Sequence, residues 1–204
     1  MTKNFQLYLK GVKCLGETFS EWGDDEIMLV GFGITDHGER IFFKPMYLGS
    51  FETGDVGYND AAHPLTLVDT EVSVDTKLIS ACIYMVEQDN GDVYTSGNAL
   101  QNAFNRTLDR LQQENTAAGM SGRELWFYSF AQAMTFIRNN IDLAANDWFN
   151  DDDLLGHLFK TIKADKPMPW EGPLTFEIVP YPVDGALYAL TFEYHLNPAP
   201  LVTL

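Results

Sequence analysis

The sequence predicts a mainly β protein of the α+β class, an antiparallel β-sandwich with an inserted helical hairpin. Two changes of hydrophobic period lead to this prediction. Strand-like patterns cover roughly the first 95 residues, a helical period covers residues 96–146, and strand-like patterns return near the end. Because strands flank the helical segment on both sides, we expect residues 1–204 to form a single sandwich domain.

Seven segments have the composition of strands, with β-branched, aromatic and apolar residues in partial alternation. They are 5–15, 26–35, 40–48, 65–74, 78–87, 174–179 and 187–196. Turn-forming residues such as Asp36-His37-Gly38 separate them, and residues 54–64 are expected to be a long polar loop. Gly31-Phe32-Gly33 lies inside a strand segment and lacks the spacing of a dinucleotide-binding loop, which indicates a packing role.

Two helices are expected between residues 96 and 146. The first carries its apolar residues on one face: Leu100, Phe104, Leu108 and Leu111. The second begins at Ser121, with Glu124 completing a capping box, and has its own apolar stripe. That stripe is Trp126, Phe130, Met134, Ile137 and Ile141. Trp126 and Phe127 point in different directions, so one of them is expected to be exposed to a partner.

The chain is strongly acidic. It has 29 Asp and Glu residues against 13 Lys and Arg residues, a formal net charge of -16. Such a surface repels nucleic acid and anionic lipid, so nucleic acid is excluded as a direct partner and a membrane requires a bridging cation. The charge favours divalent cations or a basic protein partner.

The N-terminal residues contain no apolar run of the length of a secretion signal, and no segment reaches the length of a membrane span. Cys14 and Cys82 stand alone in apolar segments, which indicates two buried free thiols; a disulfide between them is the alternative, which their spacing does not support. We therefore expect a cytoplasmic protein, with export by a leaderless route as the alternative.

Three acidic clusters lie near the ends of predicted elements, at 22–26, 87–92 and 150–153. Calcium takes six to eight oxygen ligands, many of them carboxylates, in irregular geometry. Loops that meet at one end of a sandwich can supply such ligands. Each cluster also has a simpler interpretation. Residues 22–26 and 87–92 have the composition of solvated turns, and Asn150 or Asp151 can cap a helix or lie in a solvated loop.

The third cluster carries a family resemblance. Asp153-Leu154-Leu155-Gly156 resembles the motif that ends the third calcium-binding loop of C2 domains, and Asp147 stands where that family has an upstream aspartate ligand. Asp25-Glu26-Ile27-Met28-Leu29 is distantly similar to the stretch that closes the first calcium-binding loop of C2 domains, with Asp25 at the position of the aspartate ligand. The resemblance implies a C2-like sandwich and a role for these three aspartates in binding Ca2+. Two further family ligands fall on Ala145 and Phe19, whose side chains carry no oxygen.

The predicted function is a non-enzymatic binding module. In its calcium-dependent form, acidic loops bind Ca2+ and engage a protein, glycan or lipid head group. The candidate metal ligands are Asp24, Asp25, Asp89, Asp92, Asp147, Asp151 and Asp153. The alternative needs no metal: an acidic immunity, adaptor or assembly protein that binds a basic protein partner. The four histidines have no catalytic or zinc-like spacing, and no carboxylate pair is singled out, so no catalytic residue is predicted.

Overall fold

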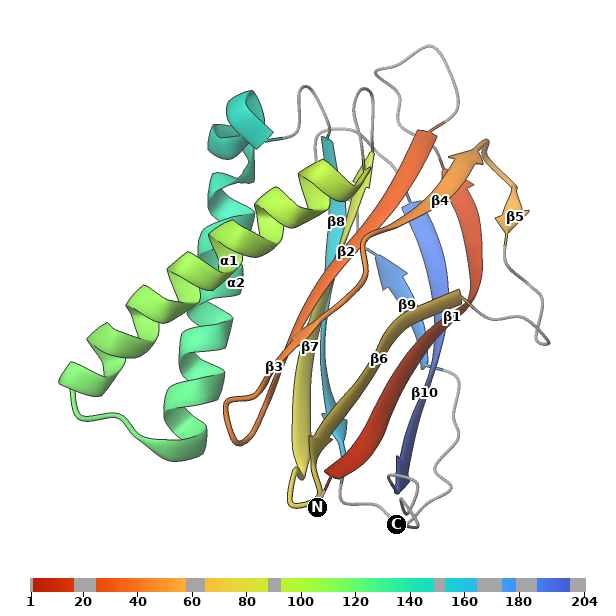
Figure 1. Cartoon of the computed structure of the whole chain (residues 1–204). Coiled ribbons are helices and arrows are strands. Elements are labelled where there is room, and N and C mark those ends of the chain that lie inside the picture. Colours follow the sequence, from red (N-terminus) through yellow and green to blue (C-terminus); the bar gives the residue numbers. More distant parts are fainter. Residues whose placement is uncertain are drawn as a thin grey trace.

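The computed structural model describes residues 2–16, 25–57, 65–87, 93–148, 153–164, 174–178 and 187–198. Within these ranges the chain forms two antiparallel sheets and two long helices, arranged in three layers (Figure 1). The prediction of an α+β fold, in which a β-sandwich carries an inserted helical hairpin, is confirmed. The closer likeness to C2 domains stays a prediction.

The first sheet brings the first and last described strands together. It contains β1 (Thr2–Gly16), β5 (Val56–Gly57), β6 (Leu65–Ser73), β9 (Leu174–Ile178) and β10 (Leu187–Pro198). The strand order is β5-β1-β10-β9, and β6 also pairs with β1. In β1, buried Phe5, Leu7 and Leu9 alternate with partly exposed residues, because successive side chains of a strand point to opposite faces.

The second sheet lies between the first sheet and the helices. It contains β2 (Asp25–Thr35), β3 (Arg40–Phe42), β4 (Met46–Phe51), β7 (Leu78–Glu87) and β8 (Asp153–Lys163). The order is β3-β2-β7-β8, and β4 also pairs with β2. The central strands β2 and β7 are buried on both faces, which explains why their sequences are almost continuously apolar.

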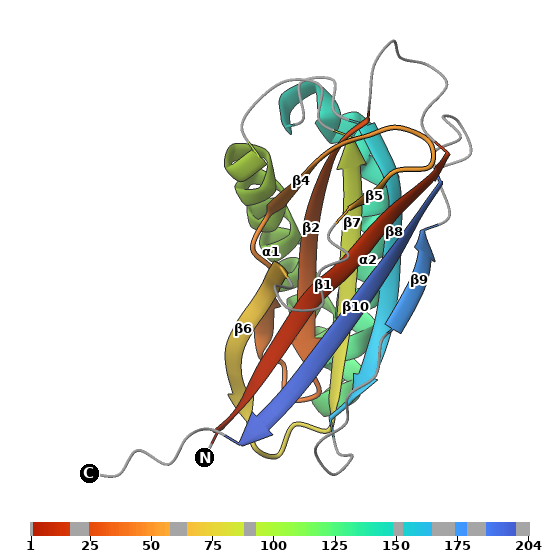
Figure 2. The same cartoon turned by 90° about the vertical axis from the view of Figure 1, so that its right-hand side faces the viewer.

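The two sheets pack face to face (Figure 2) around the larger of two apolar clusters. Every second residue of β2 and β7 points into it, including Ile27, Leu29, Ile83 and Met85. The intervening residues of the same strands point the other way, into the second cluster. One pair of strands therefore serves two cores.

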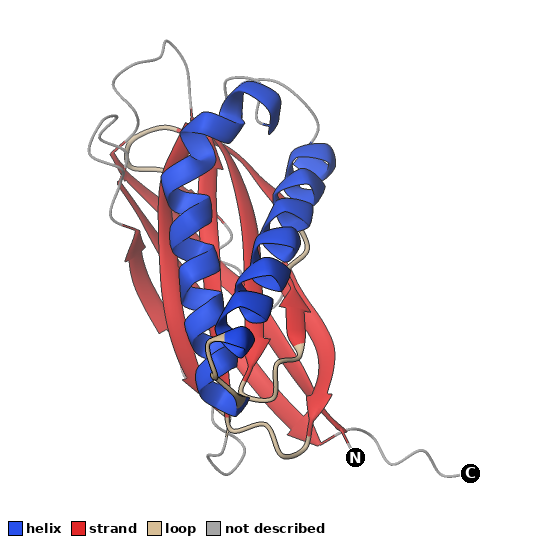
Figure 3. Ribbon diagram, turned by 90° about the vertical axis from the view of Figure 1, so that its left-hand side faces the viewer, coloured by secondary structure: helices blue, strands red, loops and turns tan. Residues whose placement is uncertain are grey.

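Helices α1 (Val93–Ala117) and α2 (Gly122–Trp148) cover the outer face of the second sheet (Figure 3). Phe104 of α1 stacks on Phe32 of β2 with ring centroids 4.3 Å apart, and Phe130 of α2 meets Phe104 edge to face at 5.6 Å. The Tyr84 hydroxyl donates a buried hydrogen bond of 3.2 Å to the carbonyl oxygen of Met134. The predicted hairpin at 96–146 is confirmed, and each end extends two or three residues further.

The strand predicted at 40–48 is divided in two. β3 ends at Phe42 and β4 begins at Met46, because the segment between them leaves the second sheet. The Lys44 amide donates to the Leu67 carbonyl of the first sheet, and Pro45 has no amide hydrogen to donate. The Phe43 ring fills the space above Gly31, where a Cβ atom would lie 2.2 Å from the ring. The packing role predicted for Gly31 is therefore confirmed.

The alternative in which Asn150 or Asp151 caps a helix is wrong. Residues 153–163 form β8, which pairs with β7 over its whole length. β7 is an apolar strand that would expose an unpaired edge without β8. Leu155 and Ile162 of β8 point into the sandwich core, and Gly156, an unfavourable residue within a helix, pairs with Met85.

Candidate functional site

Three strands reach the same end of the second sheet. β2 begins there at Asp25, β7 ends there at Glu87, and β8 begins there at Asp153, at the upper end of the sheet in Figure 1. Glu87 pairs with Ile27 on one side and with Asp153 on the other. We call this part of the sheet the acidic end. Its antiparallel register brings together the borders of all three acidic clusters, which are far apart in the sequence.

The predicted metal ligands are only partly described. Asp24, Asp89, Asp92 and Asp151 lie outside the described residues. The backbone is described at Asp25, Asp147 and Asp153, whereas their side chains are not. Asp25 and Asp153 begin strands that flank β7, and Asp147 lies in the last turn of α2. Among the side chains that the structure describes, no group of three or more His, Cys, Asp or Glu residues is placed to hold a metal ion.

Two acidic residues of this end have described side chains: Glu26 is exposed, whereas Glu87 is buried. Glu87 is 3% exposed, although its side chain is a carboxyl group and the residue terminates a strand. Burial of a carboxylate is costly unless hydrogen bonds or a cation compensate for lost water. Glu87 was not among the predicted ligands. Its position at the end of an apolar strand, next to Asp89 and Asp92, is the sequence signal that could have selected it.

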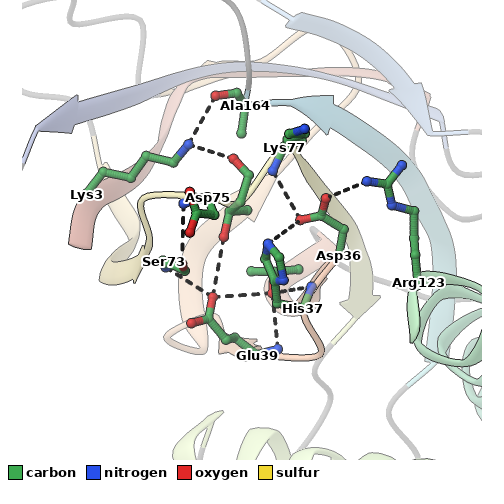
Figure 4. Close-up of polar contacts among 11 residues, drawn as sticks. Lys3, Asp36, His37, Glu39, Ser73, Asp75, Lys77, Arg123 and Ala164 are labelled. Carbon is green, nitrogen blue, oxygen red and sulfur yellow. Dashed lines mark hydrogen bonds and ion pairs between the residues drawn. The ribbon is translucent and has the colours of Figure 1, made fainter. Parts of the chain in front are cut away.

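The opposite end of the sandwich carries a network of polar contacts (Figure 4). The Asp36 carboxylate, whose side chain is 2% exposed, accepts hydrogen bonds of 3.1 Å from the Lys77 amide and from the Arg123 guanidinium. Arg123 lies in the first turn of α2. This buried carboxylate therefore ties the helical hairpin to two turns of the sandwich, and its protein donors indicate a structural role.

A second carboxylate supports the same turns. Glu39 accepts hydrogen bonds from the Ser73 amide at 3.2 Å and from the Thr35 hydroxyl at 3.3 Å. Nearby, the Lys3 ammonium donates to the carbonyl oxygens of Thr76 at 2.7 Å and Ala164 at 3.1 Å. The bonds of Ser73 with Glu39 and of Lys3 with Thr76 and Ala164 join residues far apart in the sequence, and they connect the turns at this end of the sandwich (Figure 4).

The solvent face of the first sheet contains a smaller group of titratable residues. Glu193 contacts His195 at 2.6 Å and Lys10 at 3.1 Å, and these hydrogen bonds lower the pKa of the Glu193 carboxyl. Hydrogen bonds from Gln6 and Asn4 likewise lower the pKa of Asp69. The contacts of Lys10 with Glu193 and of Asn4 and Gln6 with Asp69 join neighbouring strands of one sheet, as in a stabilising cross-strand pair, whereas His195 lies in the same strand as Glu193.

Cys14 and Cys82 are free and buried, as predicted. Burial raises the pKa of the Cys82 thiol well above its ordinary value, although a hydrogen bond with Tyr84 acts in the opposite direction. A thiol that stays protonated is a poor nucleophile and a poor metal ligand. Cys82 therefore behaves as a small apolar residue of the second cluster, and Cys14 is buried in the first.

The helical hairpin has grooves on its surface. A groove of about 450 Å³ runs between α1 and α2, and a smaller pocket of about 190 Å³ lies between α2 and β8. The aromatic group on α2 is divided between core and surface: Phe130 is fully buried, Trp126 and Phe127 are partly buried, and Tyr128 is 47% exposed. The exposed aromatic residue is thus Tyr128, rather than Trp126 or Phe127 as predicted.

No protein-family model matches the chain, and no curated protein matches it. Neither described helix has an apolar stretch long enough to cross a membrane. The features of the chain that bear on its function are its negative charge and the strand pairing at the acidic end.

Proposed function

We propose that the protein is a non-enzymatic binding module that uses its acidic end to bind a cation, and through that cation a partner. The observation that carries this proposal is the pairing of Ile27 with Glu87 and of Glu87 with Asp153. It supports convergence of the three acidic clusters, because each one borders a strand that starts or stops at this end. Carboxylates gathered in this way repel one another unless a cation neutralises them.

The distribution of charge supports the same proposal. Residues 93–148, which include both helices, contain four basic and five acidic residues, and are nearly neutral. The remaining nine basic and 24 acidic residues lie in the segments before and after these residues, which contain the strands of the sandwich. The negative potential therefore arises from the sandwich, and the acidic end adds a local concentration of carboxylates to it.

Calcium is the cation that this chemistry favours. Its six to eight oxygen ligands tolerate the irregular geometry of loops. By resemblance to C2 domains, Asp25, Asp147 and Asp153 are the first ligands to test, with Asp24, Asp89, Asp92 and Asp151 as neighbours in the sequence. A bound ion would order the loops and could engage an acidic or hydroxyl-bearing group of a protein, glycan or lipid.

A metal-free function is the second candidate, favoured by the excess of acidic residues in the sandwich. In this case the acidic end attracts Lys and Arg side chains of a basic protein directly, as an immunity, adaptor or assembly protein would. Such binding weakens steeply as salt screens the charges. The two candidates differ in what calcium does to the isolated protein.

Thermal unfolding with calcium and with a chelator separates them. A ligand specific to the folded state stabilises it by RT ln(1 + [L]/Kd), about 2.7 kcal/mol when the ligand is present at 100 times Kd. We expect calcium to raise Tm, magnesium to raise it less, and Asp153→Asn to reduce the calcium effect.

Asp75→Asn is the matched control, because Asp75 lies in the exposed turn between β6 and β7, at the other end of the sheet. It should respond to calcium like the wild type. An unchanged Tm of the wild type at millimolar calcium would exclude the calcium-dependent function. Salt-sensitive binding of a lysine-rich probe such as polylysine, lost in Asp25→Asn/Asp153→Asn but kept in Asp75→Asn, would then support the metal-free function.

A further inference from the structure

β8 lies at an edge of the second sheet. It pairs with β7 over its whole length on one side, and no strand of the described part of the chain pairs with it on the other. β9 of the first sheet comes close to β8, but it pairs with β10. The outer side of an edge strand presents backbone amide and carbonyl groups with which an extended chain can pair. β8 therefore has the backbone arrangement of a strand-addition site.

The side chains of β8 alternate between the two faces of the sheet, because its register with β7 is regular from Phe159 to Lys163. Phe159 faces the helices, since its ring centroid lies 6.1 Å from that of Phe130 of α2, and it is 48% exposed. Thr161 and Lys163 follow on the same face, and both are exposed. The helix side of this edge thus carries an aromatic, a hydroxyl and a cationic group in a row.

The pocket of about 190 Å³ between α2 and β8 lies beside this row. Its volume is below the roughly 300–1,000 Å³ of pockets that hold a drug-sized ligand, and it suits a single apolar side chain. None of the described residues that line it is a carboxylate or carries a permanent charge: Cys82, Ala131, Met134, Thr135, His157 and Phe159. Ala131 and Thr135 are exposed, so the pocket opens to solvent.

We propose that the outer edge of β8 binds an extended peptide as an added strand, with one apolar side chain of the peptide in the pocket and a carboxylate opposite Lys163. Main-chain hydrogen bonds hold such a peptide, and its alternate side chains give selectivity. Phe159, beside the pocket, and Lys163 are four residues apart, which is about 13 Å at about 3.3 Å per residue. The apolar and the acidic residue of the peptide therefore also stand four positions apart.

Charge determines the kind of partner that suits this edge. Residues 154–164 contain two lysines and no carboxylate, so a carboxylate opposite Lys163 forms a favourable cross-strand pair. A second copy of the chain would bring further lysines to the edge and a second net charge of -16, which disfavours self-association. Asp153, at the acidic end, is ten residues from Lys163, about 33 Å along the strand. Its repulsion of the peptide is screened, because the Debye length is about 8 Å at physiological salt.

Fluorescence anisotropy of a labelled peptide with the full chain tests the proposal. The probe is a nine-residue peptide that alternates Thr with Val, has Leu in place of one Val, and carries Glu four positions from that Leu. It is made in two forms, with Glu before Leu and with Glu after Leu, because antiparallel and parallel pairing require opposite orders. We expect one form to bind saturably, and replacement of its Glu by Lys to weaken binding about three- to tenfold.

Methylation of the peptide's backbone nitrogens distinguishes strand addition from docking through side chains alone. Successive amides of a strand point to opposite sides, and only one side of an added strand faces β8. Methylation of one alternate set of amides should therefore abolish binding, whereas methylation of the other set should preserve most of it. Equal losses from the two sets would overturn the proposal.

Two variants of the protein test the side-chain contacts. Lys163→Glu should invert the preference, so that the Lys peptide binds more tightly than the Glu peptide, a gain that misfolding cannot produce. Thr135→Trp should fill the pocket and remove the advantage of Leu over Ala in the peptide. Lys13→Glu, the same charge change at an exposed position of β1, is the matched control and should leave both preferences unchanged. Absence of saturable binding at millimolar peptide, or equal effects of Lys163→Glu and Lys13→Glu, would refute strand addition at β8.

Discussion

Gly38 joins the helical hairpin to the sandwich, and its replacement by alanine tests how tightly the two layers are connected. The residue lies in the turn after β2 with φ of +85°, a left-handed conformation that favours glycine. A Cβ atom at this position would lie 2.8 Å from two ring carbons of Trp126 in α2. The Trp126 ring packs on the second core, so it has little room to move away.

The expected loss of stability has two parts. A left-handed backbone costs alanine about 1–2 kcal/mol relative to glycine. Displacing a packed ring to admit a methyl group costs about 1–3 kcal/mol more. We therefore expect Gly38→Ala to lower the free energy of unfolding by about 2–5 kcal/mol. Urea unfolding, followed by circular dichroism and by tryptophan fluorescence, measures this change if the two transitions coincide.

Gly119→Ala is the matched control. Gly119 lies in the turn between the helices with φ of +92°, and a Cβ atom there would meet nothing within 4 Å. Its replacement should show the backbone part alone, so the difference between the two variants isolates the contact with Trp126. Trp126→Leu should recover part of that difference in the double variant. If Gly38→Ala is no more destabilising than Gly119→Ala, the proposed close contact between turn and helix is wrong.

Two further predictions concern titratable groups. The lowered pKa of Glu193 means that its carboxylate stabilises the fold above its ordinary pKa and loses this effect as the pH falls through the lower folded value. The Tm gap between the wild type and Glu193→Gln should therefore be largest near neutral pH and vanish in acid, and a gap independent of pH would contradict this. Because Cys14 and Cys82 are both buried, Ellman's reagent should label neither thiol in the native protein at mildly alkaline pH, and both in denaturant. Rapid labelling of the native protein would contradict this. Comparison with Cys82→Ser would then show which of the two thiols reacts.

The helices could be predicted from the sequence because their signals are local. Leu100, Phe104 and Leu108 repeat every four residues, and all three are buried against the second sheet. Ser121 directly precedes α2, which is the position predicted for the N-cap of this helix. Most strand bounds also agree with the predicted segments to within two residues, since turn residues interrupt the chain where the strands end.

The strand β8 could not be predicted by the same means. Leu155, Leu158, Phe159 and Ile162 have the spacing of a helical stripe, and the same segment also satisfies a strand with one irregular position. The edge of β7 decides between them, because pairing with β8 satisfies its backbone donors and acceptors. That edge is formed by residues about 75 positions away in the sequence, so a local pattern contains no information about it.

For the candidate sites, the sequence alone determined the net charge of -16, the three acidic clusters and the near neutrality of the hairpin. Only the tertiary structure decided that Asp25, Glu87 and Asp153 begin or end strands at one end of a sheet, and that Tyr128 is exposed whereas Trp126 is partly buried. Charge and periodicity belong to the chain itself and can be counted. Strand register and helix-face burial depend on partners distant in sequence, and they exist only once the sheets and helices have packed together.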